Sequence, residues 1–324
     1  MSRPEPMIGK VERFVALRSF GGWDGLPTKE IALIASLTRP RRFKRGDTVF
    51  VEGEPVDSVY MVISGNLSLR RKGRELGRYG PRSGVGGLAG FARDPDGYDC
   101  VALEDTLTLE VDIEDIEEVL EERFHILLTM LRGMARQSIQ VRQTIPSAGF
   151  THSPDAGTEC PAHRLNPVER MFYMRRTPMG AGRIDSIAEL SMRAEEIRAA
   201  EGEVLWRRGD APDTLVMIIC GRIRGETDNG TTFEFGAGDL VGALDTVSDL
   251  PRWYEATVVD GLVALELHRD QTLDLWEDHP DLAMQVLRGF SGGLLRLLSE
   301  NATTIDTLND GLTLQDGGLT IQDL

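Results

Sequence analysis

The sequence has few cysteines and no long hydrophobic run. Its 324 residues include three cysteines, Cys100, Cys160 and Cys220, which are too few and too scattered to predict a disulfide framework. No apolar stretch approaches the roughly 20 residues that span a membrane. The N-terminal MSRPEPMIGK lacks the apolar core of a signal peptide. We therefore expect a cytoplasmic protein in a reducing compartment, without a membrane segment.

Positive charge is also scarce. The chain has 36 lysines and arginines against 52 acidic residues, which gives a net charge of −16. Proteins that bind duplex DNA normally present a basic stripe that neutralises phosphates. The one basic run, residues 39–45, is interpreted as a solvated turn rather than a phosphate-binding patch. The charge balance therefore predicts that DNA is not the partner.

Catalytic motifs and metal-binding spacings are missing as well. The sequence has no Gly-x-Ser-x-Gly, no Walker loop and no His-Glu-x-x-His. His152, Cys160 and His163 lie close together, but no fourth ligand follows at a suitable spacing, so no metal is expected. These absences predict a protein that is not an enzyme.

What the sequence does contain is an internal repeat. The segment FKRGDTVFVEGEPVDSVYMVISGNL, residues 43–67, returns as AAEGEVLWRRGDAPDTLVMIICGRI, residues 199–223. A constant offset of 156 residues relates the glycine pairs Gly46 and Gly202, Gly53 and Gly209, Gly65 and Gly221, and Gly133 and Gly289. Glycine at such positions is typical of bends that need positive φ or a close backbone approach. The repeat therefore extends from the first strands to the last helix of each copy.

This spacing of glycines, acids and aliphatic residues resembles the opening half of the cyclic-nucleotide-binding domain. The family includes bacterial catabolite-activator-type regulators, the regulatory subunits of cAMP-dependent protein kinase, and cyclic-nucleotide-gated channels. The resemblance implies an α+β, mainly β fold, with two tandem antiparallel β-rolls of the double-stranded jelly-roll type, each flanked by helices. We expect a first domain at 8–145, a linker at 146–165, a second domain at 166–300 and a tail at 301–324.

In ligand-binding members of the family, a phosphate-binding cassette follows, of the form Phe-Gly-Glu-Leu-Ala, a short helix, then Arg-x-Ala-[Ser/Thr]. Helix amides and the arginine hold the cyclic phosphate there, and the glutamate accepts a hydrogen bond from the ribose. Both copies here lack that glutamate and have no arginine at the matching position, although Arg93 and Arg252 stand a few residues earlier. The candidate ligand-binding residues are Gly86, Gly87, Leu88, Arg93, Gly242, Ala243, Leu244, Arg252, Tyr254, Ala256 and Thr257.

Two hypotheses follow for these degenerate cassettes. The loss of a charge-assisted hydrogen bond to phosphate weakens binding by roughly 1.5–3 kcal/mol. This favours the first hypothesis, in which the two rolls serve as a protein-binding scaffold and bind no cofactor. The alternative is a sensor for a cyclic nucleotide or a related small ligand, held by Arg252 and backbone amides. A non-enzymatic regulatory protein with a protein partner is expected in both cases, and the domain-terminal helices could pair in a dimer.

The C-terminal tail contains three near-copies of one short unit. Apolar Leu312, Leu314, Leu319 and Ile321 alternate with polar residues, as in short strands. Such a segment either stays disordered, folds back on its own β-rolls, or docks on a partner by strand addition. Its end also resembles tails that direct cargo into encapsulin shells, so a shell-docked cargo protein is a further alternative.

Overall fold

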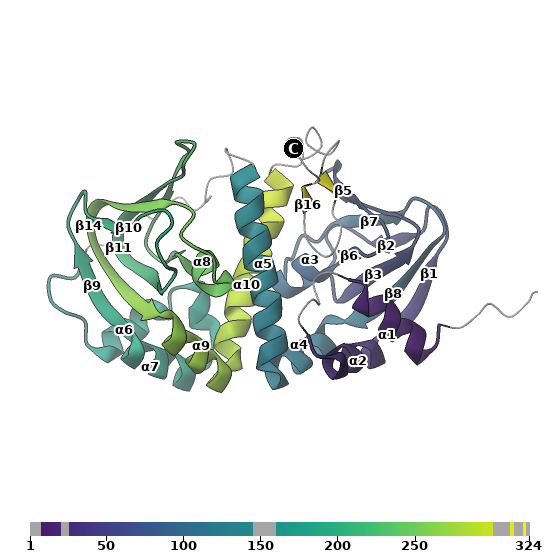
Figure 1. Ribbon diagram of the computed structural model, residues 1–324, viewed down its shortest axis with the longest axis horizontal. Helices are drawn as coiled ribbons and strands as arrows, with labels where there is room; N and C mark the ends of the chain where they lie inside the picture. The colour runs from purple at the N-terminus through teal and green to yellow at the C-terminus, as the bar shows by residue number, and fades with distance from the viewer. Residues whose placement is uncertain (1–7, 21–25, 145–159, 301–311, 314–319, 322–324) are drawn as a thin grey trace, which may run out of the picture. The chain divides into compact units, whose positions relative to one another are not determined.

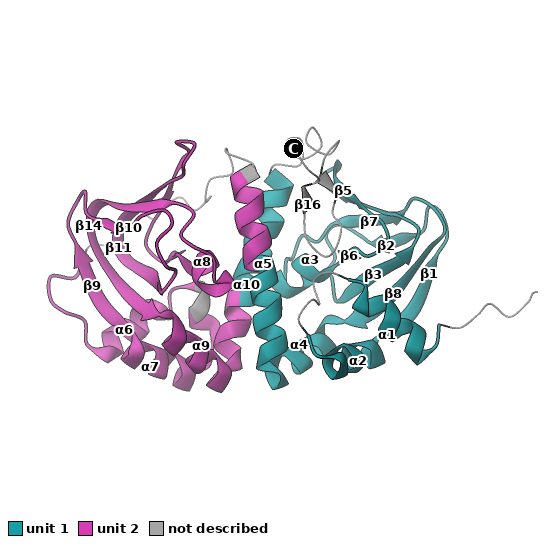
Figure 2. Ribbon diagram, in the orientation of Figure 1, with its two compact units in different colours: residues 1–134, 287–324 teal, residues 135–286 magenta. Residues whose placement is uncertain are grey.

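Two antiparallel β-rolls with flanking helices make up the computed structural model shown in Figure 1. The structure describes residues 8–20, 26–144, 160–300, 312–313 and 320–321. The chain divides into two compact units, residues 1–134 with 287–324 and residues 135–286 (Figure 2). The fold class predicted from the repeat is therefore confirmed.

Unit 1 is built on two four-stranded antiparallel sheets, ordered β1-β8-β3-β6 and β2-β7-β4-β5. Between them lies a core that includes Val62, Leu67 and Tyr98. Helices α1 (Lys10–Arg18) and α2 (Thr28–Leu37) precede the roll, α3 (Gly87–Ala92) lies within it, and α4 (Ile113–Glu122) and α5 (Phe124–Thr144) follow it. The strands are β1 (Arg39–Phe43), β2 (Thr48–Phe50), β3 (Ser58–Ser64), β4 (Leu67–Arg71), β5 (Arg74–Tyr79), β6 (Gly84–Val85), β7 (Asp99–Ala102) and β8 (Thr106–Asp112).

Unit 2 repeats this plan with two long, bulged strands at its centre. These are β11 (Thr214–Glu226) and β14 (Glu255–His268), which pair with each other. The other strands are β9 (Glu195–Ala199), β10 (Val204–Trp206), β12 (Thr232–Phe235) and β13 (Leu240–Val241). The helices are α6 (Pro167–Met174), a short 3-10 helix (Pro178–Ala181), α7 (Ile184–Arg193), α8 (Ala243–Ser248), α9 (Arg269–Asp278) and α10 (Pro280–Glu300).

The two terminal helices are exchanged between the units. Residues 135–144 of α5 belong to unit 2, and residues 287–300 of α10 belong to unit 1, so each helix changes colour along its length in Figure 2. Within unit 1, Leu295 of α10 is part of the core of the roll. Within unit 2, Arg136 of α5 donates to the carbonyl of Ser248, 3.3 Å away. Each roll is thus completed by a helical segment from the other sequence copy.

Helices α4 and α5 are separated at Arg123, so residues 112–144 do not form one continuous helix. Helix α7 begins at Ile184. One local expectation needs correction. The basic run at 39–45 includes strand β1, whose Arg41 Nε lies 2.6 Å from Glu110 Oε2 on β8. Its charges are therefore neutralised by acids of the neighbouring strand.

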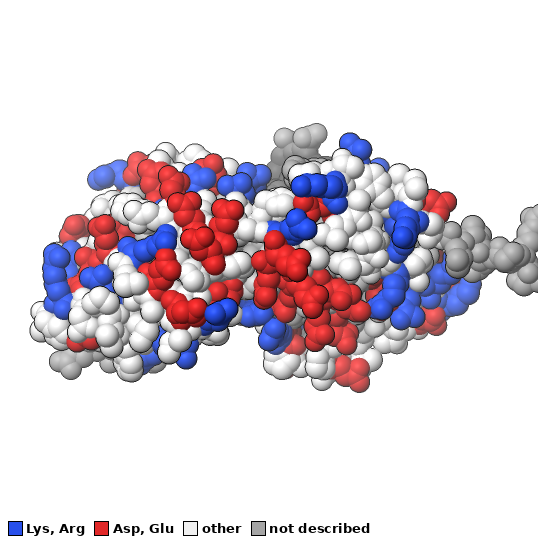
Figure 3. Space-filling view, turned by 90° about the horizontal axis from the view of Figure 1, so that it is seen from below, with Lys and Arg blue, Asp and Glu red and all other residues white. Residues whose placement is uncertain are grey.

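Helix α4 is amphipathic, with an apolar side that is buried and an acidic side. Its buried side is formed by Ile113, Ile116, Val119 and Leu120. Six acids occupy its other positions: Glu114, Asp115, Glu117, Glu118, Glu121 and Glu122. Acidic side chains gather in the region of this helix in Figure 3. Helix α4 therefore presents an acidic face on unit 1.

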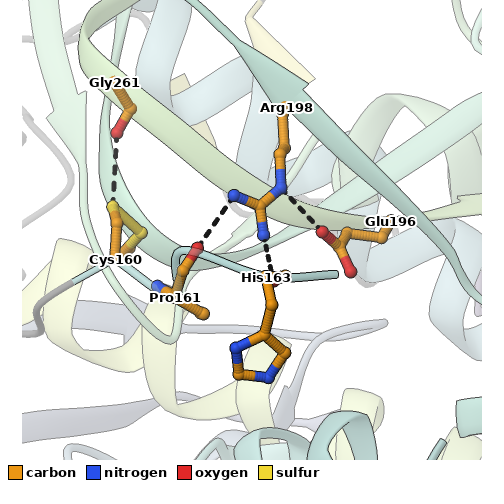
Figure 4. Close-up of a disulfide and its surroundings, with 7 residues drawn as sticks. Cys160, Pro161, His163, Glu196, Arg198 and Gly261 are labelled. Atoms are coloured by element: carbon orange, nitrogen blue, oxygen red, sulfur yellow. Dashed lines mark hydrogen bonds and ion pairs between the residues drawn. A yellow bond between two sulfur atoms is a disulfide. The ribbon is translucent and has the colours of Figure 1, made fainter. Parts of the chain in front are cut away.

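A disulfide joins Cys160 to Cys220 on β11, across a sequence separation of 60 residues (Figure 4). Arg198 of β9 holds the same segment, because its Nη1 donates to the carbonyl of Pro161 at 2.8 Å and its Nη2 donates to the carbonyl of His163. The third cysteine, Cys100, is free and buried. The expectation that the cysteines stay unpaired is wrong for this pair, because a fold can bring together residues that are scattered in sequence.

Among the described residues, no cluster of three or more His, Cys, Asp and Glu side chains could hold a metal ion. His152 lies outside the described residues. None of the described helices is long and apolar enough to span a membrane. In the tail, β15 (Leu312–Thr313) pairs with β16 (Thr320–Ile321) in antiparallel fashion, whereas Leu314 and Leu319 lie outside the described residues.

Candidate ligand-binding cassettes

Each cassette contains a short helix that begins after a glycine. Gly86 precedes α3 with φ of 98°, and Gly242 precedes α8 with φ of 78°. A Cβ at Gly86 would lie 2.2 Å from the carbonyl oxygen of Ser58, and one at Gly242 would lie 2.5 Å from Nη1 of Arg252. Both the positive φ and the close approach require glycine. A glycine with positive φ therefore opens each cassette helix.

The hydroxyl of a buried tyrosine accepts a hydrogen bond from the amide of the glycine that precedes each helix. The amide of Gly86 donates to the hydroxyl of Tyr98 at 2.6 Å, and the amide of Gly242 donates to that of Tyr254 at 3.1 Å. Both tyrosines are only 2% exposed. Burial raises the pKa of both hydroxyls well above its ordinary value, so both stay neutral. One of the amides at each helix N-terminus is thus already paired with a neutral side chain.

Aromatic rings fill the interior of both rolls around these tyrosines. In roll 1, the ring centroid of Phe50 lies 5.7 Å from that of Tyr98 and 5.4 Å from that of Tyr60. In roll 2, the ring of Tyr254 has neighbours at 4.9, 5.2, 5.8 and 5.9 Å: Trp253, Phe233, Trp206 and Phe235. The interior of each roll is therefore packed hydrophobic core.

Arg252 is buried beside the second cassette helix, where both of its Nη atoms contact the protein, whereas its Nε has no hydrogen-bond partner among the described residues. Its Nη1 lies 3.1 Å from Asp245 Oδ2 and donates to the carbonyl of Gly242 at 3.2 Å, and its Nη2 donates to the carbonyl of Thr214. The guanidinium carbon lies 4.1 Å from the ring centroid of Trp206. Burial raises the pKa of Asp245 to about 6, and the charge of Arg252 opposes that increase. The charge of Arg252 is thus balanced by the buried carboxylate of Asp245.

The remaining predicted residues are dispersed. Arg93 ends α3 with φ of 51°, and its side chain, 65% exposed, lies 3.1 Å from Glu117 Oε2 on α4. Gly87 is the first residue of α3, Leu88 and Leu244 are partly buried, Ala243 and Ala256 are buried, and Thr257 lies on β14 opposite Val204. Among the predicted residues, the structure therefore brings Gly242, Arg252 and Tyr254 together, and it places Arg93 on the surface.

Tyr254 was among the residues predicted from the sequence, whereas Tyr98 and Asp245 were not. Tyr98 and Tyr254 have the repeat's offset of 156 residues, and each stands 12 residues after its helix-opening glycine. That regularity would have identified them as a pair. Asp245 carries no comparable signal, because the corresponding residue of the first copy is Ala89. Its role depends on burial next to Arg252, which composition and spacing do not report.

The hydroxyl of Tyr254 makes a measurable contribution to stability. Tyr254→Phe keeps the ring but leaves the buried amide of Gly242 without its partner, so we expect a loss of about 1–3 kcal/mol in the free energy of unfolding. Urea denaturation followed by circular dichroism measures it. The control is Tyr173→Phe on α6, which should change stability by less than about 0.5 kcal/mol. Equal stability of the Tyr254→Phe variant and the wild type would contradict the role of this bond.

Comparisons with known proteins match both rolls. The family model described as cyclic nucleotide-binding domain matches residues 40–123 and 196–279. The CRP-like cAMP-activated global transcriptional regulator of Mycobacterium tuberculosis is 30% identical over 139 residues, which cover 41% of this chain and 62% of that protein. The global nitrogen regulator of Synechococcus elongatus is 30% identical over 111 residues, which cover 32% and 50%. The chain thus spans half to about three fifths of the length of these relatives.

Solved structures with similarity to the chain include two kinds of regulator. The regulatory subunit of a cAMP-independent protein kinase A from Trypanosoma brucei is 15% identical, with a TM-score of 0.34 and coverage of 94% of this chain and 97% of that one. The N-terminal domain of a transcriptional regulator from Streptomyces coelicolor is 28% identical, with a TM-score of 0.35 and coverage of 41% and 96%. Because the two segments matched by the family model make up just over half of the chain, the protein belongs to the cyclic nucleotide-binding domain family.

Proposed function

We propose that this chain is a non-enzymatic regulatory and interaction protein whose two rolls do not bind cAMP or cGMP in the usual way. The observation that carries the proposal is the pairing of Tyr98 and Tyr254 with the helix amides of Gly86 and Gly242. The residues do not fit a cyclic nucleotide, because the cassettes lack the family's glutamate and the buried Arg252 already pairs with Asp245. The rolls then serve as rigid, filled scaffolds.

A protein is the partner we propose for these scaffolds. The relatives with 30% identity are named as regulators, and the net charge of −16 favours a protein over DNA. The tail residues Leu312, Leu314, Leu319 and Ile321 remain our candidate contact. Docking of the tail on a shell, pairing of the terminal helices in a dimer and the cytoplasmic location stay predictions.

A cyclic-nucleotide sensor is the second candidate function, because one buried arginine does lie beside a cassette helix. Arg252 donates to the carbonyl of Gly242, next to the amide that Tyr254 occupies. The relative from Mycobacterium tuberculosis is named as cAMP-activated. For a cyclic phosphate to bind there, it would have to displace both Asp245 and the Tyr254 hydroxyl. We therefore place this function second.

Calorimetric titration of the full chain with cAMP and with cGMP tests the proposal. We expect no saturable heat up to about 100 µM nucleotide, because binding would break a buried ion pair and open a packed interior. The intrinsic fluorescence of Trp206 and Trp253, which border Tyr254, provides a second readout that should not change. Micromolar binding that Arg252→Lys weakens at least tenfold would instead establish the sensor.

A further inference from the structure

Unit 1 has a recess that lies outside the interior of its roll. Its volume is about 830 Å³, within the usual range for small-molecule sites. Three elements line it: the β4–β5 hairpin, the end of α3 with the loop after it, and the last turns of α10. The recess therefore adjoins the C-terminal end of α3, whereas Gly86 and the cassette amide lie at the other end of that helix.

The lining of this recess is basic although the chain is strongly acidic. Five cationic side chains line it against the two carboxylates of Asp94 and Glu300. The cations are Arg71, Lys72, Arg74, Arg93 and Arg296. In a protein with a net charge of −16, a concentration of positive charge around a cavity is unexpected from composition alone. Such a concentration attracts anions.

Some of these cations are already engaged and others are not. Arg71, whose side chain is 13% exposed, lies 3.0 Å from Asp94 and 3.2 Å from Asp96. Arg93 pairs with Glu117 on α4. Within the described part of the chain, no ion pair or side-chain hydrogen bond engages the other three, which are Lys72, Arg74 and Arg296. Three unneutralised positive charges thus face one cavity.

The backbone that carries these charges is fixed by specific contacts. Lys72 sits at the hairpin tip with φ of 52°, and its amide donates to the carboxylate of Glu52 at 2.9 Å. On α10, Leu295 is 5% exposed in the core of roll 1, which anchors the turn that bears Arg296. A Cβ at Gly292 would lie 3.7 Å from the Cβ of Ala92, so α10 runs close to α3. The cations therefore come from rigid elements rather than from a mobile loop.

Unit 2 has a matching recess of about 650 Å³ that provides an internal comparison. At the repeat's offset of 156 residues, Thr227 and Asp228 of unit 2 stand where unit 1 has Arg71 and Lys72. The hairpin of unit 2 thus contributes a carboxylate at the position where unit 1 contributes an ammonium group. The positive hairpin is a property of unit 1 and not of the fold.

We propose that the recess of unit 1 is a binding site for a small polyphosphate anion, with Lys72, Arg74 and Arg296 as its principal contacts. Three separate cations match a ligand that carries at least two phosphate groups. A cyclic monophosphate has a single negative charge and would pair with only one of the three cations. A bound polyphosphate would join the β4–β5 hairpin to α10. It would thereby strengthen the attachment of this exchanged helix to roll 1, independently of whether the cassettes bind nucleotide.

Calorimetric titration of the full chain with inorganic tripolyphosphate tests the site. We expect saturable binding at one site per chain that weakens as salt rises. The double variant Lys72→Gln/Arg296→Gln should bind at least tenfold more weakly. The control, Lys10→Gln/Arg224→Gln, removes two exposed positive charges that do not line the recess and should bind within twofold of the wild type.

Two further measurements decide the outcome. Circular dichroism should show the same melting transition for both double variants, so that a difference in affinity reports the site and not the fold. Titration with cAMP should give at least tenfold weaker binding than tripolyphosphate. Absence of saturable binding by the wild type, or an equal loss of affinity in the control variant, would overturn the proposal.

Discussion

Arg252→Met should destabilise the protein by about 3–5 kcal/mol at pH 7, because it leaves the carboxylate of Asp245 buried without its cation. Methionine retains most of the volume and the apolar contact with Trp206, so the loss reports charge rather than a cavity. Urea denaturation gives the free energy of unfolding. The double variant Arg252→Met/Asp245→Asn should recover much of the loss, because it removes both charges.

The dependence of this effect on pH provides an independent check. The native pKa of Asp245 is raised to about 6, above its ordinary value of 3.8, so the native state binds more protons than the unfolded chain between those values. The contribution of Asp245 to the free energy of unfolding therefore falls as pH rises from about 4 to 6, and it is constant at higher pH. In the Arg252→Met variant, the native pKa of Asp245 should rise further, because the positive charge of Arg252 lowers the pKa of Asp245 in the wild type.

The cost of Arg252→Met should consequently be smaller at pH 5 than at pH 7, since protonation removes the unpaired charge. The control variant is Arg222→Met on β11, whose partners Glu234 and Asp260 are well exposed, and which should lose about 1 kcal/mol or less. A cost for Arg252→Met that is equal at the two pH values, and no recovery in the double variant, would show that the ion pair is not the cause.

Reduction of the Cys160–Cys220 disulfide should lower the free energy of unfolding by about 4 kcal/mol, in a chain-entropy model of a 60-residue loop. The bond limits the freedom of the unfolded chain between the segment before α6 and strand β11. Cys160→Ser should reproduce the loss, because Cys160 is exposed and its substitution leaves the core intact. Denaturant titration with and without a dithiol reductant measures the effect.

The specificity of that effect can be checked in one step. Adding the reductant to Cys160→Ser should produce no further loss, since the remaining free cysteines form no bond. Thiol titration of the denatured wild-type chain should give one thiol before reduction, from Cys100, and three afterwards. Three thiols before reduction, or unchanged stability of Cys160→Ser, would refute a structural disulfide.

The repeat made the fold predictable, because glycines at bends are local requirements. Gly65 and Gly221 have φ of 89° and 86°, and a Cβ at either would lie less than 2.5 Å from another residue. The positive φ at such bends can be recognised from the spacing of glycines in the sequence, whereas the residues that a Cβ would meet, Thr106 and Gly261, are distant in sequence. The glycines that open the cassette helices, Gly86 and Gly242, were identified instead by the resemblance to the family's cassette.

Interactions between distant segments were beyond that reasoning. The pairing of Cys160 with Cys220 and the burial of Asp245 against Arg252 depend on how the chain folds back on itself. The assignment of residues 287–300, the last two thirds of α10, to unit 1 is of the same kind, because an apolar helix face indicates burial but not the surface that buries it. The basic recess also combines residues from both sequence copies.

The exchanged helices mean that neither sequence copy is a complete folding unit. A fragment cut at the boundary of the first copy, residues 8–145, would have the strands of roll 1 but would lack Leu295, a member of its core. A fragment with only the second copy would lack residues 135–144, which unit 2 includes. Each copy therefore depends on a helical segment that the other copy encodes, and we expect the two rolls to fold only when both copies are joined in one chain.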